Sequence, residues 1–420
     1  MIAHGAKLDL PCIPIAVKDN IMTIGTKPAA GSIALYKSNR VRSSSKDAMV
    51  VVRLKSAGCI LVGKGNMDEF ALGFTSLSSR GGQTRNAYSP LRYPGGSSGG
   101  VGVSVALGLA VIGVGTDTGG SVRIPAAFGN LFGIRPKMHT IPMDHDVVPL
   151  SHSRDVVGLM TRGARDLAMA LQVSSDSNFM SCLKKKVHVK LGVLRFLFPT
   201  KDKSVMKVYT RALSKLSHMN VLNVESAPNL QSKLNELFHF KSTSSFEFED
   251  DMTRFFEQNI SLNEILSLTK THCKLSESEC EGIIQSIRKK KKSRSASKQS
   301  LDSYRYLVET FTEILRKEIQ SLMDSNELTA LVYPAFQKLP SLISSGKQAY
   351  CSNNKISPSS NLPAITVPIG VHPISKQEEV PFGLEVIGLD ECSLLNTVYI
   401  IETALALPES VPRHLKPHFE

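Results

Sequence analysis

The 420-residue chain contains no tryptophan, few aromatic residues and no apolar run long enough to cross a membrane. A spanning helix needs about 20 apolar residues, whereas the most apolar stretch, residues 101–114, is shorter and is interrupted by glycine and serine. The sequence therefore predicts no membrane span. Hydrophobic residues make up 42% of the chain and charged residues 21%, which is typical of a globular protein and excludes a disordered chain or a collagen.

Cysteine is also scarce. The seven cysteines are scattered, odd in number and never spaced as CxxC, which argues against a zinc site or a dithiol redox motif. This pattern favours reduced thiols, as in a reducing compartment, and we expect a cytoplasmic protein.

Acidic residues are in deficit, with 37 Asp and Glu against 50 Lys and Arg, so the net charge is +13. Such an excess suggests nucleic-acid binding. Much of it lies in two runs, residues 184–186 and Arg288 to Arg294, which are more typical of solvated loops or helix ends, the alternatives being an anionic partner or a targeting signal. Because aromatic residues do not alternate with these runs, we expect no direct contact with nucleic acid.

The chain divides by composition into residues 1–170, 171–330 and 331–420. The first and last parts alternate short apolar runs with helical periodicity, and the middle is richer in Lys, Ser and Glu with a helical pattern. This predicts an α/β fold in which the outer parts share one mixed, largely buried sheet, covered by helices on both faces, with the middle part as a helical insertion. The expected strands are 13–17, 59–62, 111–114, 331–333, 364–367 and 384–387; the expected helices are 47–55 (capped by Asp47), 99–109 and 394–406.

Two glycine-rich clusters contain serine, at residues 94–100 (PGGSSGG) and 115–125 (GTDTGGSVRIP). A hydroxyl nucleophile beside exposed backbone amides is what acyl transfer requires. Three other interpretations remain open. A phosphate-binding loop lacks its GxxxxGK[ST] pattern, ordinary turns explain one cluster better than two, and a GxSxG nucleophile elbow at Gly96–Gly100 would need a later histidine in a recognisable context.

A lysine is the alternative base. Lys18 ends the apolar run Ile13–Val17, and burial at a strand end would lower its pKa enough for proton transfer. A surface lysine whose stem packs on the strand is an equally good interpretation on physical grounds alone.

The order of these motifs decides between the interpretations. PIAVKDN around Lys18, GGSSGG at 95–100 and GTDTGGSVRIPA at 115–126 together resemble the amidase signature family. The stretches GKGNMDEF at 63–70 and TRN at 84–86 also resemble family motifs. The likeness covers residues 13–170 and resumes at 331–337 and 359–404.

The resemblance implies a Ser–Ser–Lys triad. Position by position, Ser121 would be the nucleophile, Ser97 the bridging serine, preceded by a cis peptide bond in the family, and Lys18 the base. The backbone amides of Thr118, Gly119, Gly120 and Ser121 would bind the oxyanion, while Asp117 and Arg123 would support the loop. No metal or cofactor is implied, and a small-molecule amide is the expected substrate.

Two branches fit this resemblance. An indoleacetamide- or arylacetamide-type hydrolase is favoured by SVRIPA at 121–126, by the run at 148–155 and by Gly383–Glu385. The alternative is the glutamyl-tRNA(Gln) amidotransferase component that releases ammonia from glutamine, favoured by residues 67–70 and by the basic charge, although that component usually has Gln at the position of Ile124. The hydrolase branch implies an enzyme that acts without other subunits, either as a single chain or as a homodimer. The amidotransferase branch implies partner subunits and permits a mitochondrial location.

Overall fold

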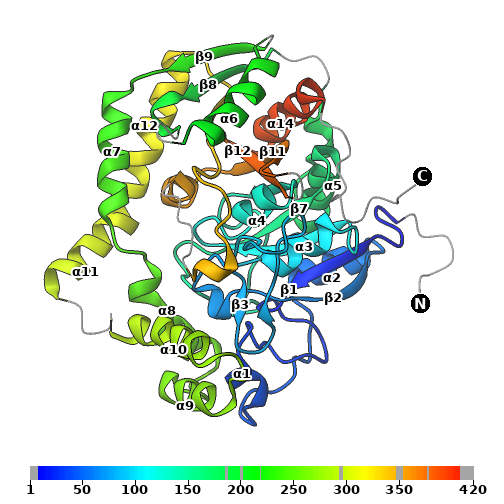
Figure 1. The fold of residues 1–420 in the computed structure, drawn as a ribbon, viewed down its shortest axis with the longest axis vertical. Helices are drawn as coiled ribbons and strands as arrows, with labels where there is room; N and C mark the ends of the chain where they lie inside the picture. Colours follow the sequence, from blue (N-terminus) through cyan, green and yellow to red (C-terminus); the bar gives the residue numbers. More distant parts are fainter. Residues whose placement is uncertain are drawn as a thin grey trace.

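The computed structural model describes residues 8–184, 188–198, 202–217, 219–292, 297–346, 353–375 and 378–406. A ten-stranded sheet forms its centre (Figure 1). The strands lie side by side in the order β2 (Ile60–Gly65), β1 (Pro14–Lys18), β5 (Ile112–Asp117), β7 (Val156–Thr161), β6 (Phe132–Arg135), β11 (Ala364–Pro373), β12 (Glu379–Ile387), β10 (Ala330–Pro334), β8 (Lys190–Leu194) and β9 (Asn220–Val224).

The sheet is mixed. β1 runs parallel to both β2 and β5, the neighbours from β5 to β10 are antiparallel, and β8 is parallel to both β10 and β9. This confirms the predicted α/β class. Residues 171–330 are not only helical, however, because β8 and β9 extend the sheet at one edge. Their five-residue runs are too short for periodicity to separate strand from helix.

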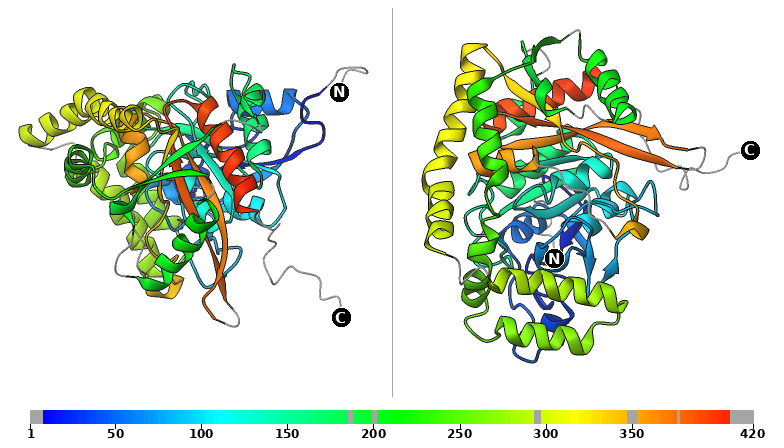
Figure 2. Two further views of the ribbon diagram at one scale, coloured as in Figure 1. Left: turned by 90° about the horizontal axis from the view of Figure 1, so that it is seen from above. Right: turned by 60° about the vertical axis from the view of Figure 1, so that its left-hand side comes forward.

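Helices cover both faces of the sheet (Figure 2). One face carries α2, α5, α6 and α14, and the other carries α3, α4, α7 and α12. The helices are α1 (Ile33–Lys37), α2 (Met49–Ser56), α3 (Gly99–Ala106), α4 (Arg123–Phe128), α5 (Ala164–Ser174), α6 (Lys203–Lys215), α7 (Pro228–His239), α8 (Ser244–Phe255), α9 (Leu262–His272), α10 (Glu277–Lys292), α11 (Lys298–Arg305), α12 (Thr312–Ser325), α13 (Ile356–Ser360) and α14 (Glu391–Leu405).

The strands alternate their side chains between these two layers. In β10, Ala330 and Val332 pack in the core beneath α6 and α14, whereas Leu331 and Tyr333 pack against α7 and α12. Because both faces of the sheet are buried at β7 and β10, these strands are nearly continuous apolar runs, as expected for strands covered on both sides, whereas the edge strands β2 and β9 are partly exposed.

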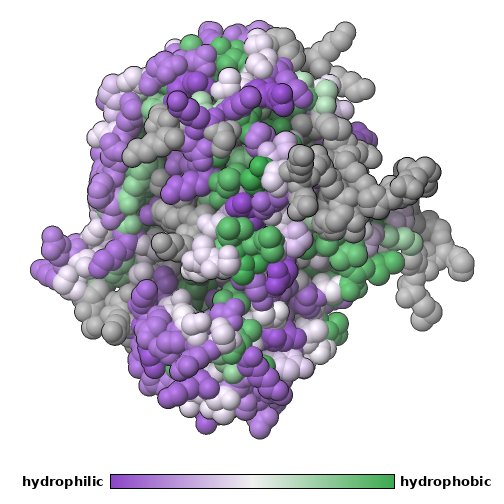
Figure 3. Space-filling model, in the orientation of Figure 1, coloured by the Kyte–Doolittle hydropathy of each residue, from purple (hydrophilic) through white to green (hydrophobic). Residues whose placement is uncertain are grey.

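Helices α8, α9 and α10 pack against residues 30–72 rather than against the sheet. Phe248, Ile265 and Ile287 supply the apolar contacts from these helices. The outward surface of this region is mainly hydrophilic (Figure 3), as expected for helices that bury one face. The middle of the chain therefore reaches the same part of the molecule as the first motifs.

The expected elements in the outer parts are present, with ends shifted by a few residues. The predicted N-cap of α2 is wrong: the capping position is Ala48, and Asp47 instead accepts hydrogen bonds from Ile24 N and Lys55 Nζ. The Met49 amide at the helix start donates to Asp146 Oδ2 at 2.7 Å. A residue 97 positions away does the capping, which local sequence could not reveal.

The prediction of reduced thiols is wrong for four cysteines. Cys182 is bonded to Cys392, and Cys273 to Cys280. The first pair is 210 residues apart in sequence, so only the fold brings the two sulfur atoms together. Because these cysteines are bonded, the argument from reduced thiols no longer supports a cytoplasmic location. Cys351 lies outside the described residues.

The two basic runs are described in part. Lys185, Lys186 and Arg294 lie outside the described residues, and Arg288–Lys292 forms the end of α10. No helix in the described ranges is long and apolar enough to cross a membrane.

Candidate active site

Lys18 is the last residue of β1 and lies on the face of the sheet that α3 covers. Side chains alternate along a strand, so Ile15 and Val17 enter the main core while Ala16 packs on the α3 side. Lys18 follows Ala16 by two residues and shares its face. The strand thereby directs an amine into a wholly buried position.

The Lys18 amine contacts hydroxyl groups rather than a carboxylate. Its Nζ lies 2.7 Å from Ser97 Oγ and 2.8 Å from Thr116 Oγ1. Burial lowers the pKa of Lys18 to about 7, although three carboxylates farther away favour its charged form. Near neutral pH a large fraction of Lys18 is therefore unprotonated and can accept a proton.

Ser97 lies in the loop before α3, and the Gly96–Ser97 peptide bond is cis. A side chain at Gly96 would come within 2.0 Å of Asp68 Oδ2, so only glycine fits between the loop and that carboxylate. The next serine is directed elsewhere, because Ser98 Oγ donates to the Thr116 carbonyl at 3.2 Å. Of the two serines, Ser97 is the one in contact with Lys18.

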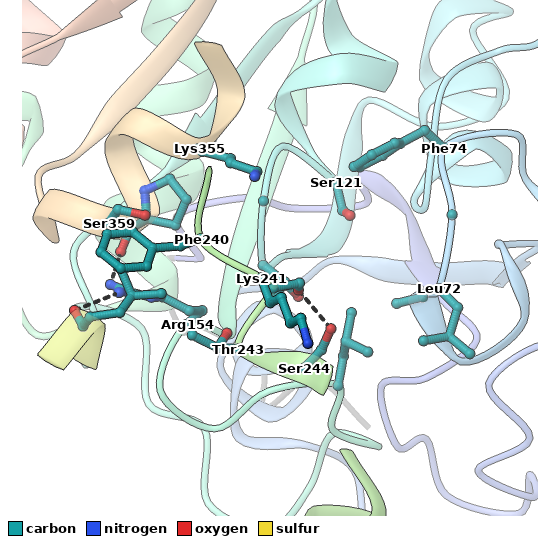
Figure 4. Close-up of a pocket in the computed structure, with 18 of the residues that line it drawn as sticks. Leu72, Phe74, Ser121, Arg154, Phe240, Lys241, Thr243, Ser244, Lys355 and Ser359 are labelled. Carbon is teal, nitrogen blue, oxygen red and sulfur yellow. Dashed lines mark hydrogen bonds between the residues drawn. The ribbon is translucent and has the colours of Figure 1, made fainter. Parts of the chain in front are cut away.

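Ser121 follows the turn after β5. Gly120 has φ +114°, and a side chain there would approach Asn354 Cβ to 2.8 Å, so the turn requires glycine. The Ser121 carbonyl accepts a hydrogen bond from Ser98 N at 3.1 Å, which ties the two loops together. The Ser121 hydroxyl lies at the wall of a cavity (Figure 4). Among the described residues no hydrogen bond joins it to Ser97.

A buried charge network supports this turn. The Arg123 guanidinium donates to both carboxylate oxygens of Asp117 at 3.1 Å and to Glu385 Oε1 at 2.6 Å. Burial alone would raise the pKa of Asp117, but Arg123 and Arg135 hold it well below its ordinary value. Asp117 is thus a fixed anion that organises the turn around Ser121.

The loop amides differ in their availability. Gly120 N donates to Asp117 Oδ1 at 2.8 Å, so the prediction that this amide binds an oxyanion does not fit the geometry. Thr118, Gly119 and Ser121 line the cavity, and no side chain in the described part of the chain accepts from their amides. We therefore propose these three amides as the donors that bind the oxyanion.

Two polar contacts of the site were not predicted from the sequence. Thr116 holds the Lys18 amine through its hydroxyl, and Asp155 accepts a hydrogen bond from Thr118 Oγ1 at 2.6 Å. Asp155 also accepts from the amides of Leu150 and Ser151. Both residues lie inside motifs quoted above, but Lys18 and Thr118, which they contact, are 98 and 37 residues away in sequence.

The cavity in front of Ser121 has a volume of about 370 Å³. Its walls come from the loop at 71–74, from Thr118–Ser121, and from residues 237–244 of the middle segment, with single residues from elsewhere. The loop before β7 contributes Leu150 and Arg154, and the segment around α13 contributes Lys355, Pro358 and Ser359. Much of the cavity wall thus comes from the middle segment. This is the part of the chain that the resemblance to the amidase signature family did not cover.

One cluster has the composition of a metal site. His152 Nδ1 lies 2.9 Å from Asp251 Oδ1, and Glu247 completes the group. Glu247 already accepts hydrogen bonds from Ser151 Oγ and Tyr304 OH. This group therefore reads as a polar network that joins α8 to the loop before β7.

Comparison with known proteins shows the family of the chain. Residues 2–395 match the amidase family. The chain therefore belongs to the amidase family, a family of hydrolases that act on amide bonds. The fold resembles that of native peptide amidase from Stenotrophomonas maltophilia, with a TM-score of 0.79 and 24% identity over 96% of this chain and 85% of that one.

Two kinds of curated relative share sequence with the chain. An indoleacetamide hydrolase of Pseudomonas syringae pv. syringae is 28% identical over 401 residues, which is 92% of this chain and 85% of that protein. A glutamyl-tRNA(Gln) amidotransferase component of Sulfurisphaera tokodaii is 38% identical over 216 residues, 49% of this chain and less than half (45%) of that protein.

Proposed function

We propose that the protein hydrolyses a small carboxylic amide to the acid and ammonia, with Ser121 as nucleophile, Ser97 as proton relay and Lys18 as base. The observation that carries the proposal is the 2.7 Å contact between the buried Lys18 amine and Ser97 Oγ, next to the loop that presents Ser121 to the cavity. A desolvated amine with a pKa of about 7 is suited to proton transfer at neutral pH.

The reaction proceeds through an acyl-enzyme. Neutral Lys18 takes the proton of Ser97 while Ser97 takes that of Ser121, and Ser121 Oγ attacks the amide carbonyl. The amides of Thr118, Gly119 and Ser121 stabilise the oxyanion. The proton returns through the same chain to the leaving nitrogen as the C–N bond breaks, and water then hydrolyses the ester in a second cycle.

Ammonia release from an arylacetamide and from glutamine tests this proposal. Ser121→Ala should lower turnover at least about a thousandfold, because the remaining groups cannot form the ester. Ser98→Ala is the matched control, since its hydroxyl is bonded to the Thr116 carbonyl and takes no part in the relay. Full activity of Ser121→Ala would exclude the assignment.

A second candidate is release of ammonia from glutamine for a partner enzyme. It is favoured by the 38% identity to an amidotransferase component over 216 residues. The near full-length likeness to indoleacetamide hydrolases favours the free-standing enzyme instead. The second candidate would be selected if the protein released ammonia from glutamine but not from the arylacetamide. It would also be selected if ammonia release required added partner subunits.

A further inference from the structure

The cavity in front of Ser121 is lined by basic side chains. Arg154, Lys241, Lys290 and Lys355 all contribute to its wall, whereas no Asp or Glu does so among the described residues. Charges of one sign around a concave, partly dry space produce a strong local potential. The cavity therefore attracts negative charge.

The lysines of the middle segment are not neutralised by neighbours. No carboxylate in the described ranges forms an ion pair with Lys241 or Lys290. Lys290 Nζ donates to Ser244 Oγ at 2.8 Å and to Ser245 Oγ at 3.4 Å, which orients the ammonium without offsetting its charge. Burial lowers the pKa of Lys290 to about 8, as expected for a cation without a counter-ion.

Lys290 differs from the other cations of its helix. Arg288 is exposed and pairs with Glu281, and Lys289 is exposed as well. Lys290 instead turns toward the start of α8 and the cavity. One residue of the basic run is thus part of the cavity wall, while its neighbours form an ordinary solvated surface.

The remaining cations have different positions. Arg154 is held by the Leu307 carbonyl, Thr312 Oγ1 and the Pro358 carbonyl, so its donors serve the fold. Figure 4 shows the Lys355 side chain extending toward Ser121, whereas Lys241 lies beside Ser244. Lys241 and Lys290 therefore lie together in the part of the wall next to the start of α8.

We infer that the substrate is an amide whose acyl group carries a carboxylate, and that Lys241 and Lys290 bind this carboxylate while Ser121 attacks the amide. The inference rests on the proposed amide hydrolysis and specifies its substrate class. Apolar side chains also line this cavity, namely Leu72, Leu150, Leu237, Phe240 and Leu307. A hydrocarbon linker fits such a wall, and a volume of about 370 Å³ suits a small ligand.

A matched substrate pair tests the inference. The monoamide of a straight-chain dicarboxylic acid is compared with the neutral amide in which a methyl group replaces the carboxylate. We expect kcat/KM to favour the acid at least about tenfold, because a hydrogen bond to a charged group contributes about that factor or more. Chain lengths from four to ten carbons, roughly the range that such a cavity accepts, locate the best fit.

Variants assign the effect to the two lysines. Lys241→Met and Lys290→Met should each lower kcat/KM for the acid about tenfold, through KM, and leave the neutral amide within about twofold. Lys289→Met, on the same helix but outside the cavity, is the control and should change neither value. Methionine keeps the apolar stem, and thermal melting checks that each variant folds.

Binding separates this inference from the proposed function. Calorimetric titration of Ser121→Ala with the half-amide should give saturable binding whose Kd rises about tenfold when Lys290→Met is added. If the wild type hydrolyses acid and neutral amides equally and the lysine variants have no effect, the inference is wrong and the hydrolase stands. If the half-amide binds as expected but no amide is hydrolysed, the proposed function fails. Absence of binding overturns the inference.

Discussion

Replacing Lys18 by methionine should make the stability of the protein respond differently to pH. The wild-type amine is wholly buried, and its pKa falls from 10.5 to about 7. That difference corresponds to about 5 kcal/mol of destabilisation when both the folded and unfolded states are protonated. Methionine has similar length and no charge, so Lys18→Met removes this cost together with the proposed base.

The sign follows from proton binding. Between pH 7 and 10.5 the unfolded chain holds the Lys18 proton and the folded chain has released it, so the stability of the wild type rises with pH in this window. From pH 7 to pH 9 the contribution of Lys18 grows by about 2 kcal/mol. Below pH 7 both states are protonated and the contribution levels off.

Urea unfolding of wild type and Lys18→Met at pH 7 and pH 9 measures this change. The free energy of unfolding of the wild type relative to the variant should increase by about 2 kcal/mol at the higher pH. Val17→Ala, a neighbouring buried position on β1, is the control: it loses apolar contacts but its difference from the wild type should not depend on pH. A pH-independent difference for Lys18→Met would refute the reasoning that burial lowers the pKa of Lys18.

Four further results are expected. The kcat/KM of the wild type should rise with pH through about 7, as Lys18 loses its proton, which a pH–rate profile measures. Arg123→Met should lower the free energy of unfolding by about 3–5 kcal/mol, because Asp117 would remain buried without its main partner. Gly120→Ala should lower the melting temperature more than Gly119→Ala, where a side chain meets nothing within 4 Å. Cys182→Ser should lower stability by about 2–4 kcal/mol under oxidising conditions, and equal stability would contradict the 182–392 disulfide.

Much of the site could be predicted from short motifs. Lys18, Ser97 and Ser121 lie in three runs whose order resembles one family, and the structure brings Lys18 and Ser97 into contact. The choice of Ser97 over Ser98 agrees with the directions of the two hydroxyls. Local apolar runs also indicated the strands on either side of the site, because a sheet buried on both faces needs them.

Contacts between distant segments could not be predicted in the same way. Asp146 caps α2 from 97 residues away, and Cys182 meets Cys392 across 210 residues. Each depends on a side-chain direction or on a distance in space that no local pattern encodes.

By itself the sequence determined the fold class, the family and the three residues proposed for catalysis, since these depend on local hydrophobic patterns and on motif order. Only the tertiary structure decided the state and surroundings of those residues. The pKa of Lys18 follows from complete burial, which requires the packed sheet and helices. The basic cavity wall follows from the packing of α8 and α10 near the Ser121 loop, because burial and potential depend on what surrounds a group in space.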